Sequence, residues 1–126
     1  MSLAISGLYA ALAGLMLIVL SVRVIQLRRA RGLSSGDGGD AELTRRIRAH
    51  GNFCEYVPLA LIILAAVEGA GYPAWLVHCL GICLLAGRVV HAWSMSAGSI
   101  RARVAGMSLT FLVLGVGSVA AIADFF

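Results

Sequence analysis

Four long apolar blocks, separated by short polar segments, dominate the pattern of hydrophobic and polar positions along this chain. The blocks cover residues 3–27, 52–67, 74–95 and 104–125, and a polar segment from Thr44 extends the second block backwards. A helix needs about 20 residues to cross the hydrocarbon core of a bilayer, and no two-residue alternation suggests a barrel. The pattern predicts an all-α integral membrane four-helix bundle: transmembrane helices at about 3–27, 44–68, 74–95 and 103–125 in one domain over residues 1–126.

Composition supports a bilayer as the surrounding solvent. Of the 126 residues, 60% are hydrophobic and only 13% are charged, with a mean hydropathy of +0.94. A soluble domain usually has roughly a quarter of its residues charged. The first block ends in Arg28 and Arg29 rather than in a small-residue cleavage site, so we expect a mature helix and not a signal peptide. The three cysteines lie in apolar stretches and indicate no disulfide framework.

The arginines predict the orientation of the helices. The net charge is +4, and most arginines flank the first connection, a Gly- and Ser-rich segment at 28–43 that reads as a flexible loop. Arg101 and Arg103 flank the third connection, whereas the tight turn at Gly69–Pro73 and both termini carry no arginine. By the positive-inside rule, loops one and three are cytoplasmic and both termini lie outside. Because the arginines sit between apolar blocks, the charge argues against a nucleic-acid partner.

A narrow polar stripe follows the cytoplasmic half of the second helix. At 3.6 residues per turn, five side chains fall within an arc of about 100°: Arg45, Arg48, Asn52, Glu55 and Tyr56. Exposing such a stripe to lipid costs several kcal/mol per charged group. It must therefore face protein or water, and we interpret it as part of a binding site. The alternative is that these groups only specify helix packing.

The third helix supplies candidate partners for the stripe. Arg88 and His91 are spaced i and i+3 and share a face. Counted from the tight outer turn, Glu55 and Arg88 lie at a similar depth, roughly 20 Å below the outer boundary. This predicts a Glu55–Arg88 ion pair, with Asn52 and His91 one turn nearer the cytoplasm.

The histidines and cysteines of the third helix are interpreted without a metal, and Arg46 of the second helix is interpreted without a role in the binding site. We expect His78, Cys79, Cys83 and His91 to pack in helices and not to form a metal site, because their side chains do not converge as a tetrahedral site requires. Arg46 lies off the stripe, and we interpret it as an anchor for anionic lipid.

The motif Arg45-x-x-Arg48-Ala49-His50-x-Asn52-x-x-Glu55-Tyr56-x-Pro58 resembles the MAPEG superfamily, membrane-associated proteins in eicosanoid and glutathione metabolism. The run Gly87-Arg88-x-x-His91 is similar to the membrane prostaglandin synthase branch of that family. The long first loop and the Arg103-Val104-x-Gly106-Met107 start of the fourth helix look most like its small bacterial branch. The resemblance covers the whole chain in helix number, lengths and orientation.

The resemblance implies a homotrimer in a bacterial inner membrane, with glutathione bound between subunits near the cytoplasmic side. By the family pattern, Arg48, Asn52, Glu55 and Tyr56 would contact glutathione, with Arg45 in the same set. Arg88 and His91 would complete the wall. Either Arg101 or Arg103 would stabilise the thiolate. The implied activity is a glutathione-dependent transferase or peroxidase that acts on a lipophilic electrophile entering from the bilayer. The expected partners are this lipophilic small molecule and membrane lipids.

The chain departs from the family pattern at three positions. Thr44 stands where the motif has a glutamate, and Trp93 and Met95 occupy the region where glutathione-synthase members carry tyrosines. These departures favour an alternative: a non-catalytic trimer that binds a lipid or another anion in the same pocket. A third hypothesis, a transporter that couples solute to protons through Glu55, lacks the inverted repeat expected of such proteins.

Overall fold

The computed structural model describes residues 3–124 and 126, and within them the chain forms four helices: α1 (Ala4–Ala30), α2 (Ala41–Gly69), α3 (Ala74–Ala97) and α4 (Ile100–Ala123). Each is long and apolar enough to cross a membrane. The predicted all-α, four-helix membrane architecture is therefore confirmed. Phe125, the last residue of the fourth predicted helix, lies outside the described residues.

Side-chain caps explain why two helices begin earlier than the hydrophobic pattern indicated. The Asp40 carboxylate accepts a hydrogen bond from the Leu43 amide, and so α2 begins at Ala41. The Ser99 hydroxyl oxygen accepts one from the Ala102 amide, and so α4 begins at Ile100. Such caps satisfy amide groups that have no partner within the helix. They belong to short polar segments, which hydropathy alone assigns to loops.

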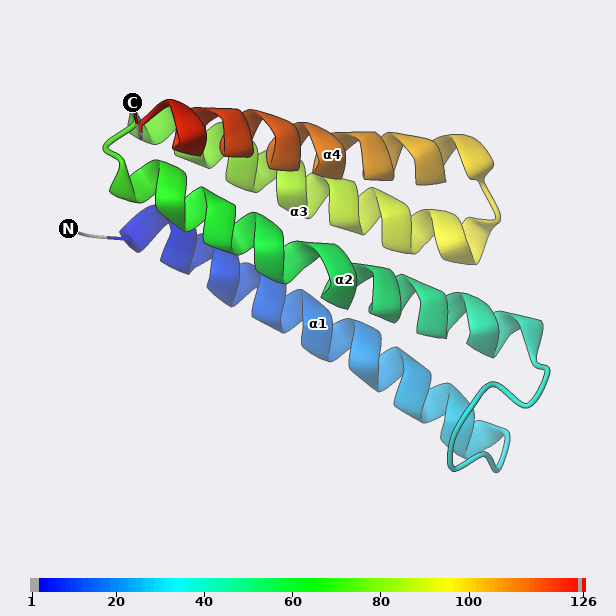
Figure 1. The fold of residues 1–126 in the computed structure, drawn as a ribbon. Coiled ribbons are helices and arrows are strands. Elements are labelled where there is room, and N and C mark those ends of the chain that lie inside the picture. The colour runs from blue at the N-terminus through cyan, green and yellow to red at the C-terminus, as the bar shows by residue number, and fades with distance from the viewer. Residues whose placement is uncertain (1–2, 125) are drawn as a thin grey trace.

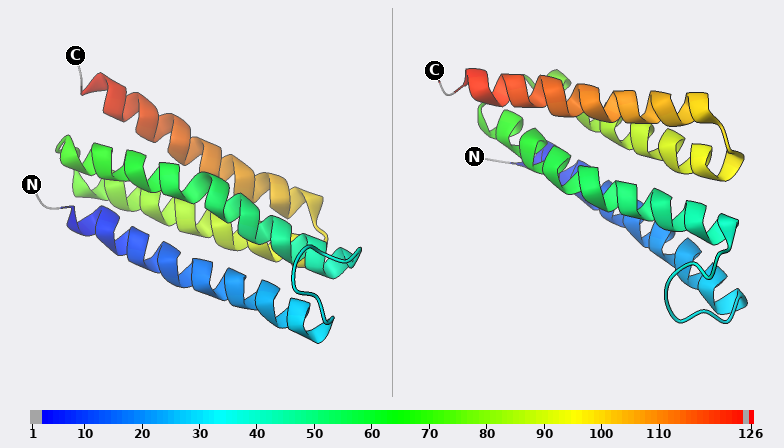
Figure 2. Two further views of the ribbon diagram at one scale, coloured as in Figure 1. Left: turned by 60° about the horizontal axis from the view of Figure 1, so that its bottom comes forward. Right: turned by 45° about the vertical axis from the view of Figure 1, so that its right-hand side comes forward.

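Successive helices run antiparallel, so the two termini and the α2–α3 turn lie at one end of the bundle and the α1–α2 and α3–α4 connections lie at the other (Figure 1). The turn between α2 and α3 is short, with Gly71 at a φ of +82° that favours glycine. Toward the end with the long loop, the α1–α2 pair diverges from the α3–α4 pair, as two views show (Figures 1 and 2). Loops one and three therefore share one end, as the arginine pattern requires.

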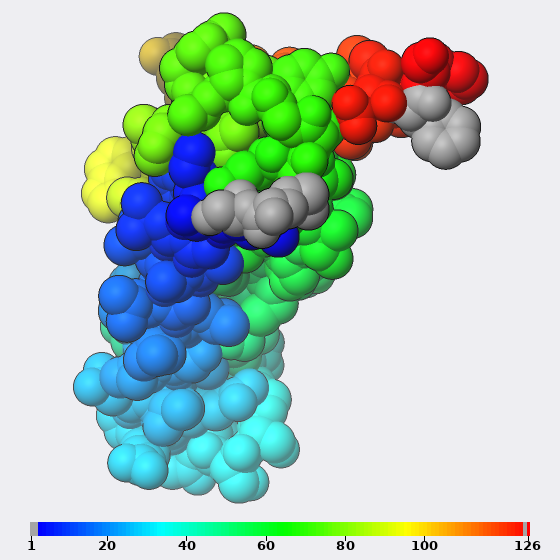
Figure 3. Space-filling view, turned by 90° about the vertical axis from the view of Figure 1, so that its left-hand side faces the viewer, coloured from blue at the N-terminus to red at the C-terminus, as the bar shows by residue number. Residues whose placement is uncertain are grey.

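The core lies between α2 and α3, which α1 and α4 flank. Buried side chains of α2 and α3 form most of it, and one cluster includes Phe53, Leu64, Val77, Leu84 and Val113. Within the described residues α1 packs on α2 and α3 but not on α4. Seen from the end with the termini, the last turns of α4 stand out from the rest of the molecule (Figure 3).

α3 and α4 approach most closely at two glycines. A Cβ added to Gly106 would lie 2.7 Å from the Gly87 carbonyl oxygen and 2.8 Å from the His91 amide nitrogen. A Cβ added to Gly87 would lie 2.9 Å from the Gly106 carbonyl oxygen. Backbone atoms cannot rotate out of the way, so only glycine permits this helix crossing. The crossing fixes the start of α4 against the half of α3 that is nearer the α3–α4 connection.

Hydrogen bonds hold the connection between α1 and α2. The Arg31 Nε donates to the Asp40 carboxylate at 2.6 Å, and the Thr44 hydroxyl donates to the Asp37 carboxylate at 2.8 Å. The Gly39 amide, and then the Thr44 hydroxyl, hold the pKa of Asp37 below its usual range. The Leu43 amide, and then Arg31, do the same to the pKa of Asp40. Both carboxylates therefore form their hydrogen bonds within the loop and the first turn of α2.

The opposite end has its own polar anchor. The Glu68 carboxylate at the end of α2 accepts hydrogen bonds from the amides of Ile5 and Ser6 and from the Ser6 hydroxyl. These amides belong to the first turn of α1, where an anion is favoured by the helix dipole. Glu68 therefore joins the start of α1 to the end of α2.

Candidate functional site

The polar stripe of α2 lies on the free face of that helix. Arg45, Arg48 and Glu55 are exposed, and Asn52 and Tyr56 are half-buried. The core side of the same helix carries buried residues such as Ala49 and Phe53. The stripe thus points away from the centre of the single chain, although its helix is membrane-spanning in length and hydropathy.

The exposed stripe continues beyond Glu55 as an apolar one. Leu59 is 54% and Ile62 is 66% exposed, and Ala66 is also exposed. Together with Arg45, Arg48, Asn52 and Glu55, these positions alternate at spacings of three and four residues. This is the average spacing of 3.5 residues that characterises a seam between packed helices. The free face of α2 therefore has the pattern of a helix–helix contact along its whole length.

Arg88 is the most deeply buried charged side chain of the described chain, at 1% exposure. Its Nη1 donates to the Asn52 Oδ1 at 2.5 Å, and its Nη2 donates to the Gly106 carbonyl oxygen at 3.2 Å and to the Met107 sulfur at 3.5 Å. Its Nε is buried without a hydrogen-bond partner. One guanidinium thus connects α3 to α2 and α4.

The predicted Glu55–Arg88 ion pair is wrong. Arg88 forms none of the ion pairs found among the described residues, and Glu55 is exposed. Counting residues from the turn between α2 and α3 gives a position along the helix, but it does not fix the rotation of a side chain about the helix axis. Asn52 faces α3, whereas Glu55, three residues on, is rotated by about 60° toward the free face. Arg88 therefore bonds to the residue one turn nearer the long loop.

His91 and Arg103 lie on either side of the α3–α4 crossing where Arg88 is held: His91 is three residues after Arg88, and Arg103 is three residues before Gly106. His91 is 5% exposed, and its backbone packs on Gly106 at the α3–α4 crossing. Both Arg88 and Arg103 are near enough to act electrostatically on the His91 ring. Arg103 is half-buried, and its Nε is enclosed without a hydrogen-bond partner. Arg101, the alternative thiolate-stabilising residue, is exposed at the surface. The structure brings Arg103, and not Arg101, to the other predicted site residues.

Tyr56 connects the stripe to α4. Its ring packs edge-on against Phe111 with centroids 5.7 Å apart, and its hydroxyl lies in the electrostatic range of Arg88. Of the predicted site residues, Asn52, Tyr56, Arg88, His91 and Arg103 thus form one group where α2, α3 and α4 meet. Arg48 and Glu55 border it on the free face. Arg45 lies one turn nearer the loop, beside a small cleft shared with Arg46 and Met95.

The structure adds partners that the sequence did not assign. The Gly106 carbonyl and the Met107 sulfur hold Arg88 in place. Both belong to the Arg103-Val104-x-Gly106-Met107 segment at the start of α4, and the glycine was the available signal of a close helix approach. Thr44 stands in place of the motif glutamate and forms its hydrogen bonds with the loop. Its hydroxyl donates to the Asp37 carboxylate and contacts the Asp40 carbonyl oxygen.

The combined charge of this group and of the residues that border it suits an anion that also carries one cationic centre. Four arginines (Arg45, Arg48, Arg88 and Arg103) accompany a single carboxylate, Glu55. Arginine forks bind carboxylates through two parallel hydrogen bonds, and a carboxylate accepts bonds from an ammonium group. The Nε atoms of Arg88 and Arg103 are unpartnered but buried, so these two arginines act on an anion through their charge.

Comparison with known proteins identifies a matching family and two bacterial relatives. The model of the MAPEG family matches residues 6–123. The chain is 42% identical over 110 residues to the inner membrane protein YecN of Escherichia coli strain K12. The aligned region covers 87% of this chain and 84% of that protein. The same figures hold for the protein of that name from Escherichia coli O6:H1.

Proposed function

The chain belongs to the MAPEG family, and from this premise we propose that it binds glutathione between the subunits of a homotrimer and transfers it to lipophilic electrophiles, or reduces lipophilic peroxides with it. The supporting observation is the position of the stripe. Arg48 and Glu55 are exposed in the isolated chain although they belong to a membrane-spanning helix. A charge that faces lipid is unfavourable by several kcal/mol, so a neighbouring subunit and a polar ligand are needed to cover them.

The seam pattern of α2 supports α2 as the centre of the assembly. Its outer half offers Leu59, Ile62 and Ala66 for packing, and its inner half offers the charged residues. Copies of α2 packed about one axis would bury the apolar half. The charged half would then line polar spaces between subunits at the end with the long loop. Asn52 and Tyr56, which are half-buried, would border these spaces, with Arg88 and His91 buried behind them.

Each residue in this group has a matching part of the tripeptide. Glutathione has two carboxylates, an ammonium group and a thiol. Arg45 and Arg48 would bind carboxylates through their guanidinium forks. Glu55 would accept hydrogen bonds from the ammonium group, and Asn52 and Tyr56 would bind the peptide backbone. Arg88 and His91 would form the wall behind the ligand.

Arg103 is the better candidate for the thiolate-stabilising residue. A thiol with a pKa near 8.5 is mostly protonated at neutral pH, and a nearby guanidinium favours the nucleophilic thiolate. Arg103 lies beside His91 with an enclosed, unpartnered Nε, whereas Arg101 is exposed. The thiolate sulfur would form a bond to the electrophilic carbon of a substrate that enters from the bilayer, and the bond from that carbon to the leaving group would break. With a peroxide, the sulfur would instead attack the peroxide oxygen and release an alcohol, and a second glutathione would then form the disulfide and release water. We further propose, by analogy with the name of the YecN relative, an inner-membrane location with loops one and three in the cytoplasm.

Titration calorimetry of the detergent-purified protein with glutathione tests the proposal. We expect binding at millimolar concentration or tighter, and a loss of at least tenfold in affinity for Arg48→Gln, because an arginine–carboxylate bond contributes about 1.5–3 kcal/mol. Arg29→Gln is the matched control, since Arg29 is an exposed arginine at the same end of the molecule but off the stripe. No heat of binding from an intact oligomer would refute the proposal. Cross-linking of the same preparation tests the trimer.

A second candidate is binding without catalysis. Met95 is 8% exposed in the region where the family's glutathione synthases carry a tyrosine, and a thioether cannot donate a hydrogen bond to a thiolate. In this second candidate function, the pocket would hold a lipid or another anion. Co-purified ligand that added glutathione fails to displace would favour it. Turnover of an electrophilic model substrate by wild type, lost in Arg103→Ala, would exclude it.

A further inference from the structure

A groove between α1 and α3 lies outside the candidate site. It has a volume of about 540 Å³ and is lined mainly by apolar side chains, among them Leu12, Met16, Val19, Leu85, Val89 and Trp93. No residue of α2 lines it. An assembly built on the free face of α2 would therefore leave this groove facing the bilayer. Its walls are large exposed side chains; Val89 is 57% and Trp93 is 59% exposed.

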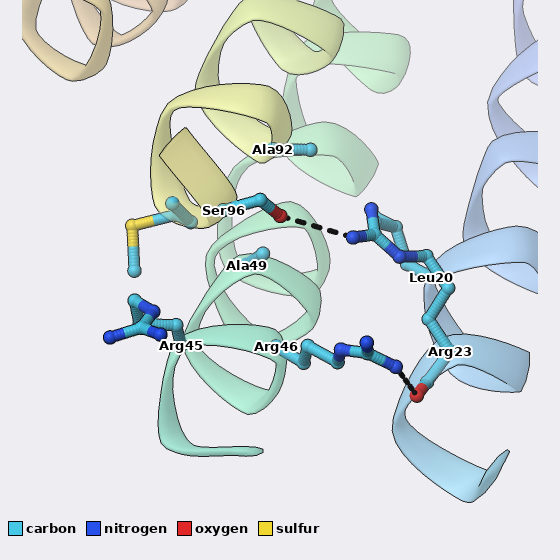
Figure 4. A pocket seen from close by; sticks show the side chains of 8 residues that line it. Leu20, Arg23, Arg45, Arg46, Ala49, Ala92 and Ser96 are labelled. Carbon is cyan, nitrogen blue, oxygen red and sulfur yellow. Dashed lines mark hydrogen bonds between the residues drawn. The ribbon is translucent and has the colours of Figure 1, made fainter. Parts of the chain in front are cut away.

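The end of the groove nearest the long loop is cationic. Arg23 lines it and donates from Nη2 to the Ser96 hydroxyl at 3.0 Å (Figure 4). Among the described residues this is the one hydrogen bond of the Arg23 guanidinium, which has five N–H donors. No carboxylate lines the groove. The Arg23 fork is therefore open to an anion from outside the chain.

Arg46 lies at the same level, where its charge is paired with Glu42. Its Nη1 donates to the Arg23 carbonyl oxygen at 2.9 Å, and its Nη2 donates to Glu42 at 2.6 Å. A small cleft lined by Arg23, Arg46 and Ser96 adjoins the groove. Arg45 also lines this cleft but points away from Arg23 (Figure 4). The cationic end is thus formed by Arg23, with Arg46 and Ser96 behind it.

The length of the groove matches one leaflet. From Arg23 to Leu12 the chain of α1 rises by about 16 Å, at 1.5 Å per residue. The hydrocarbon core of a bilayer is about 30 Å thick, so one leaflet contributes about 15 Å. Ser96 lies one residue before the end of α3, which puts the cation at the boundary of the apolar region. Trp93 is next to it, as expected of an interfacial aromatic residue.

We propose that this groove is a binding site for one anionic phospholipid. The phosphate accepts hydrogen bonds from the Arg23 guanidinium, and an acyl chain lies between α1 and α3 along Leu12, Met16 and Val89. The occupant is a phospholipid rather than a soluble anion because the cation opens onto an apolar channel of leaflet length. The negative headgroup is preferred because the channel contains an arginine and no acid.

Native mass spectrometry of the delipidated protein tests the headgroup. The protein is exposed to equal amounts of phosphatidylglycerol and phosphatidylcholine with identical acyl chains. We expect about fivefold more bound phosphatidylglycerol, which corresponds to about 1 kcal/mol for one arginine. Arg23→Gln abolishes this preference, and Arg29→Gln, the same change on the same helix but off the groove, preserves it. An equal effect of the two variants, or no preference in the wild type, overturns the proposal.

A second pair of variants tests the groove itself. Val89→Trp fills the channel, and Ile82→Trp adds the same side chain at a similarly exposed position of α3 that does not line it. We expect Val89→Trp to lose most of the retained phospholipid and Ile82→Trp to keep it. Equal retention in both means that the lipid sits elsewhere on the surface, and the site is then wrong. This comparison decides alone if Arg23→Gln is too unstable to purify.

Discussion

Arg88 of α3 and Asn52 of α2 are joined by a hydrogen bond of 2.5 Å that links two membrane-spanning helices through a cation with no carboxylate beside it. The other contacts of Arg88, the Gly106 carbonyl and the Met107 sulfur, are also uncharged. A buried arginine held only by neutral acceptors keeps an uncompensated positive charge, which attracts an anion on the far side of Asn52. An ion pair with Glu55 would have neutralised both charges.

The link between Arg88 and Asn52 predicts a specific loss of stability. Asn52→Leu removes the acceptor and leaves a buried charged donor without a partner, which destabilises the fold by about 1–3 kcal/mol. Asn52→Asp keeps an acceptor and should retain wild-type stability. Denaturation in mixed micelles measures both. A stable Asn52→Leu protein would show that water or lipid headgroups reach Arg88.

The α3–α4 crossing predicts intolerance of any side chain at Gly106. Gly106→Ala puts a Cβ against two backbone atoms, so α4 must shift and the fold loses about 1–3 kcal/mol. Gly115→Ala is the control on the same helix, because no heavy atom lies within 4 Å of its added Cβ. It should be neutral or stabilising by up to about 1 kcal/mol. Thermal unfolding in detergent distinguishes the two, and equal melting temperatures would contradict the crossing.

The anchor at the end with the termini predicts an effect of Glu68. Glu68→Ala removes the acceptor of two amides and one hydroxyl at the start of α1, a loss of about 0.5–2 kcal/mol, as for other helix caps. Hydrogen exchange of the first turn of α1 should accelerate. Asp124→Ala, at the C-terminal end of α4, should leave that exchange unchanged. Unaltered exchange in Glu68→Ala would mean that the first turn of α1 needs no cap.

The loop predicts a dependence on acid pH. The pKa values of Asp37 and Asp40 are lowered in the folded chain, so these carboxylates stabilise the loop above the ordinary aspartate pKa of about 3.9. That contribution is lost as pH falls through the depressed values. Carboxyl NMR titration should place both midpoints below the ordinary value. Arg31→Gln should raise the midpoint of Asp40 and leave that of Asp37, whose hydrogen bonds come from Gly39 and Thr44.

The difference between Arg101 and Arg103 predicts which arginine activates the thiol, if glutathione binds as proposed. A cation within about 4–6 Å lowers the pKa of an acid by about 1–3 units. Arg103→Ala should therefore abolish most of the ultraviolet thiolate absorbance of the glutathione-loaded protein at neutral pH, while Arg101→Ala preserves it. The same absorbance in both variants would assign the activation to another group, with Arg88 the next candidate.

The sequence by itself determined the helices and their order along the chain. Helix number followed from four apolar blocks of spanning length. The motif on α2 also identified the family. These features depend on local hydropathy, rise per residue and motif spacing, all of which one chain carries explicitly.

Only the tertiary structure decided which side chains meet. Rotation about the helix axes selected Asn52 rather than Glu55 for Arg88, and a helix crossing through Gly87 and Gly106 brought Arg103 rather than Arg101 to His91. It also placed Arg23 at the cationic end of the α1–α3 groove, with Ser96 as its partner. The position of a residue along its helix follows from a constant rise per residue. The rotation of a helix about its axis depends on how two particular surfaces pack, and the sequence of one helix does not specify this.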